Sequence, residues 1–186
     1  MLENEKEILE RCLKGDKKAM ETLVIAYQKP IYNYFYRNIK DTEIASDLTQ
    51  DIFLKVFSNL QKYNFSYKFS TWIFALSHNY LIDYYRKKKS ISFSTYSYDN
   101  SSTPDFPDNK HISKEDELIE EELKDSVWKA VEKLPEEYKE LITLRYVNGL
   151  KYEEISEILE IPMGTLKNKI FRAKKRLITI LKESKK

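Results

Sequence analysis

Cysteine and histidine are scarce in this chain, and their scarcity limits its chemistry. The 186 residues include one cysteine, Cys12, and two histidines. A single thiol cannot form an internal disulfide, which fits a reducing cytoplasm. So few sulfur and imidazole ligands also argue against a zinc site built by the protein. We therefore expect a cytoplasmic protein without a metal site, and we identify no site for a cofactor.

Glycine and proline are also rare, at 3 and 5 residues, and long apolar runs are missing. Polar segments instead carry regularly spaced apolar residues, which is the pattern of amphipathic helices. We find no stretch of 18 apolar residues and no basic-then-apolar leader, so nothing is expected to span or cross a membrane. The sequence predicts an all-α protein, organised as one ordinary domain or two small ones.

The net charge of +2 hides an uneven distribution of charge. Residues 1–95 carry 15 Lys and Arg against 11 Asp and Glu, residues 96–160 carry 8 against 18, and residues 161–186 carry 9 against 1. Two basic ends suit a polyanionic partner, and the acidic middle must avoid it. We interpret the acidic run from Glu115 to Asp125 as a solvated helix surface rather than as a metal site.

Residues 90–114 interrupt the helical pattern and divide the chain. This stretch, SISFSTYSYDNSSTPDFPDNKHISK, is dominated by Ser, Thr, Asn and Asp, contains two prolines and lacks a repeating apolar stripe. Such a composition predicts a flexible linker. The expected organisation is a helical domain over residues 1–89, a linker over residues 90–114 and a second helical domain over residues 115–186.

The first block contains several signals for the ends of helices. Gly15 and Asp16 predict a stop and a new start, with Asp16 capping the helix that follows. A further helix is expected from about Ile44 to Leu60, and Ser70 or Thr71 is expected to cap the last helix of the block. Four apolar residues near the start of this last helix are expected in the core: Phe69, Trp72, Ile73 and Leu76.

Residues 151–177, KYEEISEILEIPMGTLKNKIFRAKKRL, have the layout of a helix-turn-helix. Pro162 prevents the first helix from continuing. An apolar stripe then marks the second helix at spacings of four, three and four, and it consists of Leu166, Ile170, Ala173 and Leu177. A helix that is held against a scaffold by such a narrow stripe can lie in the major groove of DNA.

The outer face of this second helix has side chains that suit DNA. Its basic residues would neutralise phosphates and make the affinity depend on salt. Asn168 and Arg172 can also form paired hydrogen bonds with base edges. A basic terminal helix alone is often only solvated, but the preceding helix and the three-residue turn favour DNA binding. The face comprises Lys167, Asn168, Lys169, Arg172, Lys174, Lys175 and Arg176.

The stretch from Leu134 to Leu177 resembles region four of bacterial sigma factors, in the extracytoplasmic-function (ECF) group of the sigma-70 family. The matching positions are Leu134, Pro135, Leu144, Arg145, Gly149, Tyr152, Glu154, Ile155, Pro162, Gly164, Thr165, Lys167, Arg172, Ala173 and Leu177. In the first block, KGDKKAMETLVIAYQKPIYNYFYR, DLTQDIFLKVF and FSTWIFALSHNYLIDYYRKKK resemble segments of region two. Both blocks follow the order of the family.

The resemblance implies a sigma factor, which is not an enzyme and acts by directing core RNA polymerase to promoters in transcription initiation. Region two of the family docks on the clamp helices of the largest polymerase subunit, and Asp47, Gln50 and Asp51 match that motif. Region four of the family touches the polymerase flap and lies in the minus-35 major groove. The resemblance adds Thr165 to the predicted minus-35 contacts and gives that role to residues 164–176.

The resemblance also implies a site for the minus-10 element. Promoter opening requires a base to leave the stack, and a holder for that base needs flat apolar faces with amide or hydroxyl groups. The loop that does this in the family matches Tyr63, Asn64, Phe65, Ser66, Tyr67 and Lys68, with Asn79 beneath it. Four basic residues would hold the duplex backbone without choosing its sequence, and these are Arg86, Lys87, Lys88 and Lys89.

Several residues depart from the family pattern. Glu160 stands where the family usually has a glycine that ends the first helix, which predicts a different or strained turn. Ala75 and His78 replace two frequent arginines in the minus-10 helix, and Asn168 and Lys169 replace serine and arginine. These departures leave the promoter sequence and the melting strength open. The sequence also does not name the activating stimulus.

Two functions of other classes compete with this interpretation. A stand-alone helix-turn-helix regulator would use its first block to bind a ligand or to dimerise, and the DLTQDIF helix argues against it. A metal-dependent nuclease would need a convergent set of His, Asp and Glu residues, which we do not find. The resemblance also allows an anti-sigma factor as a partner, since many members of the family have one and some subgroups do not.

Overall fold

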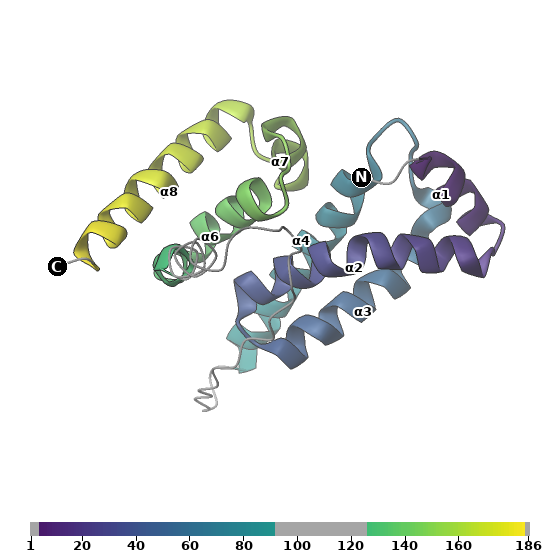
Figure 1. The fold of residues 1–186 in the computed structure, drawn as a ribbon, viewed down its shortest axis with the longest axis horizontal. Coiled ribbons are helices and arrows are strands. Elements are labelled where there is room, and N and C mark those ends of the chain that lie inside the picture. Colours follow the sequence, from purple (N-terminus) through teal and green to yellow (C-terminus); the bar gives the residue numbers. More distant parts are fainter. Residues whose placement is uncertain (1–3, 92–125, 185–186) are drawn as a thin grey trace, which may run out of the picture.

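The computed structural model describes residues 4–91 and 126–184, with side chains up to Lys88 in the first range. Within these ranges all regular structure is helical, as the sequence predicts, and the helices form two domains (Figure 1). Most of the predicted linker lies outside the described residues. The last helix of the first domain runs to Ile91, two residues past the expected boundary, and the boundaries themselves stay a prediction.

The first domain is a bundle of helices around an aromatic-rich core. Its elements are α1 (Glu5–Leu13), α2 (Lys17–Ile39), α3 (Thr42–Asn59), the short 3₁₀ turn η1 (Leu60–Lys62) and α4 (Phe69–Ile91). Asp16 caps α2 by accepting hydrogen bonds from the backbone N–H groups of Lys18 and Ala19, which confirms its predicted role. The largest fully buried side chains of this domain are Leu9, Leu23, Ile31, Tyr34, Phe35, Ile52, Phe69 and Ile73.

The start of α4 differs from the prediction. The helix begins at Phe69, because the carbonyl of Lys68 already accepts a hydrogen bond from the N–H of Trp72. Ser70 and Thr71 therefore lie buried inside the first turn, and the prediction that one of them caps the helix is wrong. The expected core positions Phe69 and Ile73 are fully buried, and Trp72 packs partly buried against them.

The second domain carries the helix-turn-helix. It consists of a helix that ends at residue 132, α6 (Glu136–Ile142), one π-helical turn η2 (Thr143–Val147), α7 (Tyr152–Ile158) and α8 (Met163–Glu183). Gly149 sits between η2 and α7 with a φ of 67°, a left-handed conformation that glycine adopts without steric cost. The turn there lets α7 fold back so that α8 can pack on α6 and α7.

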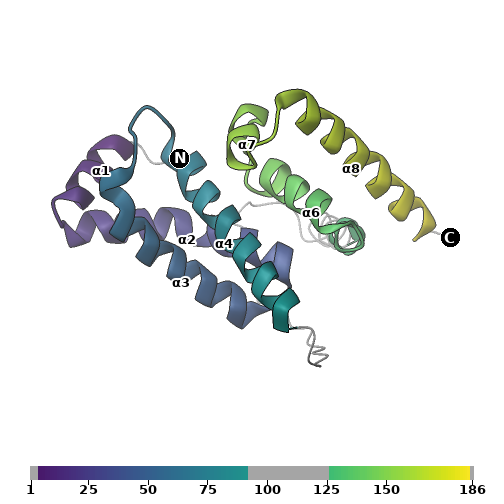
Figure 2. The same ribbon diagram turned by 180° about the vertical axis from the view of Figure 1, so that it is seen from behind.

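The two domains pack directly against each other. Helices α2 and α4 of the first domain contact α6, η2 and α7 of the second. Their buried apolar side chains form one contiguous cluster, which includes Leu141, Leu144 and Ile155 of the second domain. Helix α8 lies on the side of the second domain that is turned away from α1, α2 and α3, as both views show (Figures 1 and 2).

Candidate DNA and polymerase interfaces

The turn between α7 and α8 is closed by backbone hydrogen bonds. The N–H of Ile161 donates to the carbonyl of Ser156 at 3.2 Å, and the N–H of Glu160 donates to the carbonyl of Glu157 at 3.3 Å. This pair of bonds is a Schellman motif, whose central position is left-handed. Glu160 occupies that position with a φ of 52°. Glu160 thus takes the left-handed conformation that glycine would usually supply, and the strain expected there stays a prediction.

Helix α8 is held by the predicted apolar stripe. Leu166, Ile170 and Ala173 are buried, and Leu177 is half-buried. The helix starts at Met163, with Pro162 in the position before its first residue, where a proline is tolerated. Five of the predicted minus-35 residues are exposed on the opposite side: Thr165, Lys167, Asn168, Arg172 and Lys175. A single apolar stripe thus leaves a continuous basic face toward solvent.

The other three predicted residues of α8 also contact the second domain itself. Lys169 donates to a carboxylate oxygen of Glu137 in α6 at 2.7 Å. The ammonium of Lys174 lies 5.3 Å from the ring centroid of Tyr146, and a hydrogen bond with that tyrosine raises the pKa of the lysine. Arg176 lies over the ring of Tyr138 at 5.9 Å. Lys174 and Arg176 are nevertheless exposed and Lys169 is half-buried, so part of this basic surface is shared with α6 and η2.

One residue of this face was missed by the sequence analysis. Phe171 is 67% exposed, and it lies between Asn168 and Lys175, which are three and four positions away on the same helix face. An aromatic ring so exposed among cations gains nothing from the protein interior. The signal in the sequence that could have identified Phe171 is an apolar residue that lies outside the apolar stripe of α8. Apolar groups in a major groove can contact the methyl group of thymine.

The predicted base-holding loop, residues 63–68, divides into a buried part and an exposed part. Tyr63 is only 7% exposed and donates its hydroxyl to the carbonyl of Tyr67 at 2.5 Å. Its ring packs against Phe65 and Phe69, with centroids 5.0 and 5.7 Å apart. Asn64 accepts a hydrogen bond from the N–H of Ser66 at 2.9 Å, which shapes the turn. The rings of Phe65 and Tyr67 remain exposed.

Lys68, at the end of this loop, pairs with the second domain. Its ammonium donates to Glu154 of α7 at 2.8 Å. The other carboxylate oxygen of Glu154 accepts from the N–H of Lys151, which caps α7. Burial opposes ionisation of Glu154, but the hydrogen bonds from Lys68 and Lys151 prevail and hold the pKa of its carboxyl below the usual value. The same ion pair raises the pKa of Lys68.

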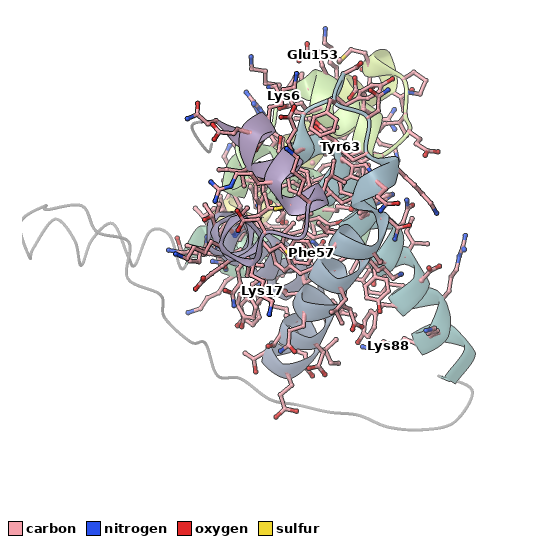
Figure 3. The ribbon with its side chains drawn as sticks, turned by 90° about the vertical axis from the view of Figure 1, so that its right-hand side faces the viewer. Lys6, Lys17, Phe57, Tyr63, Lys88 and Glu153 are labelled. Carbon is pink, nitrogen blue, oxygen red and sulfur yellow. The ribbon has the colours of Figure 1, made fainter. Side chains whose placement is uncertain are left out.

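The remaining predicted minus-10 residues follow α4 along its length. Asn79, Arg86, Lys87 and Lys88 are exposed, and the side chain of Lys89 lies outside the described residues. Tyr63 and Lys88 mark the two ends of this set and lie at opposite ends of the domain (Figure 3). The set is therefore an elongated surface rather than a pocket.

His78, one of the departures in α4, faces the second domain. Its Nδ1 lies 2.7 Å from a carboxylate oxygen of Glu140 in α6. The same oxygen accepts a hydrogen bond from the hydroxyl of Tyr34. Burial, followed by the neighbouring Glu140 carboxylate, raises the pKa of this tyrosine far above its ordinary value, so it acts as a donor. In this arrangement His78 does not face solvent as a phosphate contact would.

The predicted polymerase-docking residues lie on α3, but they are not equivalent. Asp47 and Gln50 are exposed. Asp51 is half-buried and accepts a hydrogen bond from Tyr80 of α4 at 2.5 Å, a bond that raises the pKa of the tyrosine to about 12. Leu54, which the sequence analysis did not select, is 69% exposed one turn beyond Gln50. The face therefore combines two free polar side chains with an apolar one.

Residues 4–91 and 126–184 contain no group of three or more His, Cys, Asp or Glu side chains that could hold a metal ion. None of the helices in the same ranges is long and apolar enough to cross a membrane.

Two models of one protein family match the chain. The model of sigma-70 region 2 matches residues 23–91, and the model of sigma-70 region 4 matches residues 124–177. The first match covers α3, the 63–68 loop and α4, and the second covers the helix-turn-helix.

Characterised proteins of similar sequence span nearly the whole chain. The ECF RNA polymerase sigma factor SigW of Bacillus subtilis is 31% identical over 177 residues, which are 92% of this chain and 94% of SigW. The ECF RNA polymerase sigma-E factor of Escherichia coli K12 is 33% identical over 172 residues, 90% of this chain and 88% of that protein.

Solved structures show the same fold. CnrH in complex with the cytosolic domain of CnrY superposes with a TM-score of 0.70 at 16% identity, covering 97% of this chain and 99% of CnrH. The sigma factor RpoE of Bartonella quintana, solved with the anti-sigma factor NepR, also gives 0.70 at 20% identity, covering 89% and 98%. With both regions matched in the family's order and relatives above 30% identity along almost its full length, the chain belongs to the ECF group of the sigma-70 family of RNA polymerase sigma factors.

Proposed function

We propose that this sigma factor directs core RNA polymerase to promoters by reading the minus-35 element with α8 and the minus-10 element with the 63–68 loop and α4. The observation that carries this proposal is the exposed basic face of α8, held in a helix-turn-helix by one apolar stripe. This sigma factor performs no catalytic step of its own, and it works in the cytoplasm, where the polymerase acts.

At the minus-35 element, different side chains of α8 contact phosphates and base edges. Lys167, Lys175 and their basic neighbours neutralise phosphates, which sets affinity. Asn168 and Arg172 read base edges, because an amide and a guanidinium can each form two hydrogen bonds with one base. Phe171 adds an apolar contact between them. Thr165, Lys169, Lys174 and Arg176 complete the surface.

At the minus-10 element, the exposed half of the loop holds the extruded base. Phe65 and Tyr67 supply ring faces for stacking, and Asn64, Ser66 and Asn79 supply polar groups. Tyr63 supports the loop from the core through its hydrogen bond to the carbonyl of Tyr67. The basic end of α4, residues 86–89, follows the duplex backbone.

The partners are core RNA polymerase and promoter DNA. Asp47, Gln50 and Leu54 form the proposed clamp-docking face, with Asp51 as a structural support. Region four touches the flap through the helices before α8. An anti-sigma factor is a further proposed partner, as in the RpoE complex with NepR.

The test is co-purification of the chain with core RNA polymerase. Asp47→Ala combined with Gln50→Ala is expected to abolish stoichiometric binding, because it removes both exposed polar side chains of the proposed docking face. Neither side chain supports the fold, so the variant should remain folded. Asp51 is left intact, since its loss would also remove the bond to Tyr80. Glu21→Ala with Gln28→Ala is the matched control, an exposed carboxylate and amide on α2.

The outcome separates the two candidate functions. Binding by the intact chain and by the control, with loss in the α3 variant, supports the sigma-factor mechanism and its docking face. DNA binding without any polymerase binding by the intact chain would favour a stand-alone helix-turn-helix regulator instead.

A further inference from the structure

We propose that four residues at the junction of η2, α7 and α8 bind one phosphate of the DNA backbone, with Tyr146 as a positioning residue for the ammonium of Lys174. This set, named the η2 site, consists of Arg145, Tyr146, Tyr152 and Lys174. The inference rests on the proposed minus-35 role of α8. Tyr146 belongs neither to α8 nor to the positions that resemble the family.

The π-helical turn η2 brings Tyr146 to the surface. The N–H of Asn148 donates to the carbonyl of Thr143, five positions earlier, at 3.0 Å, which is the hydrogen bond of a π-turn. Thr143 and Leu144 are buried, whereas Tyr146 is 51% exposed. Single π-turns within helical segments occur frequently at functional sites. An aromatic ring held outward in this way is not needed for the core.

Tyr146 holds the side chain of Lys174. The ammonium lies 5.3 Å from the ring centroid of the tyrosine, and the hydrogen bond between the two side chains raises the pKa of the lysine. A lysine side chain has many rotamers, and fixing it on a phosphate costs conformational entropy. Because Tyr146 already limits these rotamers in the free protein, less ordering is left for the moment at which DNA binds.

Arg145 is fixed beside this lysine. Its guanidinium donates to the carbonyl of Leu150 at 2.8 Å and lies 5.0 Å from the ring centroid of Tyr152. A guanidinium carries five N–H donors, so the bond to Leu150 leaves other donors for an anion. The aromatic face also orients the guanidinium plane. A planar donor group held in one orientation suits the oxygens of a phosphate.

The two cations lie close together without a carboxylate between them. The bond with Tyr146 raises the pKa of Lys174, and the positive charge of Arg145 opposes this rise, so the two cations are within electrostatic reach. Within residues 4–91 and 126–184, neither cation forms an ion pair. Like charges at short range repel each other, and an anion bound between them would relieve that repulsion.

The position of the site on α8 identifies the anion. An α-helix with its side chains is about 10–12 Å across and the major groove is about 12 Å wide, so the flanks of a helix in the groove face the phosphates of its two walls. Lys174 lies on the flank toward η2, whereas Asn168 and Lys175 are exposed on the outer face. On the flank toward α6, Glu137 already neutralises Lys169. The η2 flank therefore offers a phosphate two cations without a carboxylate.

A double-mutant cycle tests the positioning role. Tyr146→Phe removes one hydroxyl from an exposed side chain and keeps the ring, so the fold should be retained, which circular dichroism checks. This change is expected to weaken binding of a labelled 30-base-pair random duplex about 2- to 10-fold, the range for one hydrogen bond. In a Lys174→Ala background it should have no effect, because no ammonium is left to position. Equal weakening in both backgrounds would overturn the positioning role.

Salt dependence shows whether Lys174 meets a phosphate. Lys174→Ala is expected to lower the slope of log affinity against log salt by about 0.9, the value for one phosphate contact. Tyr138→Phe is the matched control on the other flank, where the ring of Tyr138 lies 5.9 Å from the guanidinium of Arg176. Since this change keeps the ring, affinity and slope should both stay as in the unmodified chain.

The outcomes separate the η2 site from the function on which it rests. Coupled effects at Tyr146 and Lys174, with the lower slope, support the site. An unchanged affinity in Tyr146→Phe, or an unchanged slope in Lys174→Ala while Lys167→Ala lowers it, would overturn the site and leave the minus-35 function in place. If the intact chain does not bind duplex DNA, the proposed minus-35 function fails, and the site fails with it.

Discussion

At the scale of single residues, the left-handed Glu160 is the clearest case of an energetically unfavourable backbone conformation. An L-residue in this conformation brings its Cβ too close to the backbone, and glycine avoids the clash. We expect Glu160→Gly to raise the free energy of unfolding by about 0.5–1 kcal/mol, after the greater flexibility of glycine in the unfolded chain is deducted. Urea denaturation followed by circular dichroism measures this change.

A neighbouring glutamate provides the control for this prediction. Glu157 is exposed inside α7, where the backbone is helical. Glu157→Gly should lower the free energy of unfolding by about 0.5–1 kcal/mol, because glycine is a poor helix former. If both variants are destabilised alike, the positive φ of Glu160 is not a source of strain.

Single residues also show where sequence reasoning succeeds and where it stops. The cap at Asp16 and the stripe that includes Leu166 were predictable because their partners lie within a few positions along the chain, whereas the same reasoning misplaced the start of α4 at Ser70 or Thr71. The burial of Tyr63 and the bond between Asp51 and Tyr80 were not, because an aromatic or acidic residue in a functional motif has the same local pattern whether it faces solvent or the core.

At the scale of one element, α8 combines free cations with paired ones. Lys167 is exposed, whereas Lys169 donates to Glu137 at 2.7 Å. A lysine that meets a phosphate releases a counterion and contributes about 0.9 to the slope of log affinity against log salt. We expect Lys167→Ala to reduce the slope for duplex DNA by about this amount, and Lys169→Ala to reduce it less, because Glu137 already neutralises that ammonium.

Fluorescence anisotropy with a labelled random duplex, between 50 and 300 mM salt, measures both slopes. Lys182→Ala is a control at the far end of α8, where the lysine is also exposed. A slope that falls equally for Lys167 and Lys169 would mean that DNA displaces Glu137 from Lys169.

The helical structure of α8 and its buried face were predictable, because apolar residues at spacings of four, three and four all lie on one face of an α-helix. The role of Phe171 was not recognised, because a phenylalanine among cations is also a common core residue. Only its exposure of 67% in the structure separates the two cases.

At the scale of the whole molecule, the packing of the domains was outside the reach of the sequence. Glu140 finds its partners 106 and 62 positions away, in Tyr34 and His78. Neither sequence separation produces a periodic pattern, and the sequence alone also allows other roles for Tyr34 and His78 within their own helices. The resemblance supplied the order of the two regions, and the side-chain contacts between them came from the structure alone.

The packing of the two domains against each other is expected to tolerate salt. Two of its pairs, Lys40–Glu132 and Lys68–Glu154, have lysines that are 29% and 46% exposed and are open to screening. The Glu140 contact and the apolar cluster are shielded, and screening weakens them much less. The radius of gyration from small-angle scattering should therefore stay constant between 0.05 and 0.5 M NaCl.

The same salt series on Glu140→Gln gives the contrast. When the shielded carboxylate is replaced by an amide, the packing of the two domains depends more on the exposed pairs, so this variant should expand as the salt concentration rises. Glu136→Gln is the control, an exposed glutamate on the same helix. Expansion of the unmodified chain with salt would instead show that the exposed pairs hold the domains together, and that Glu140 contributes little to their packing.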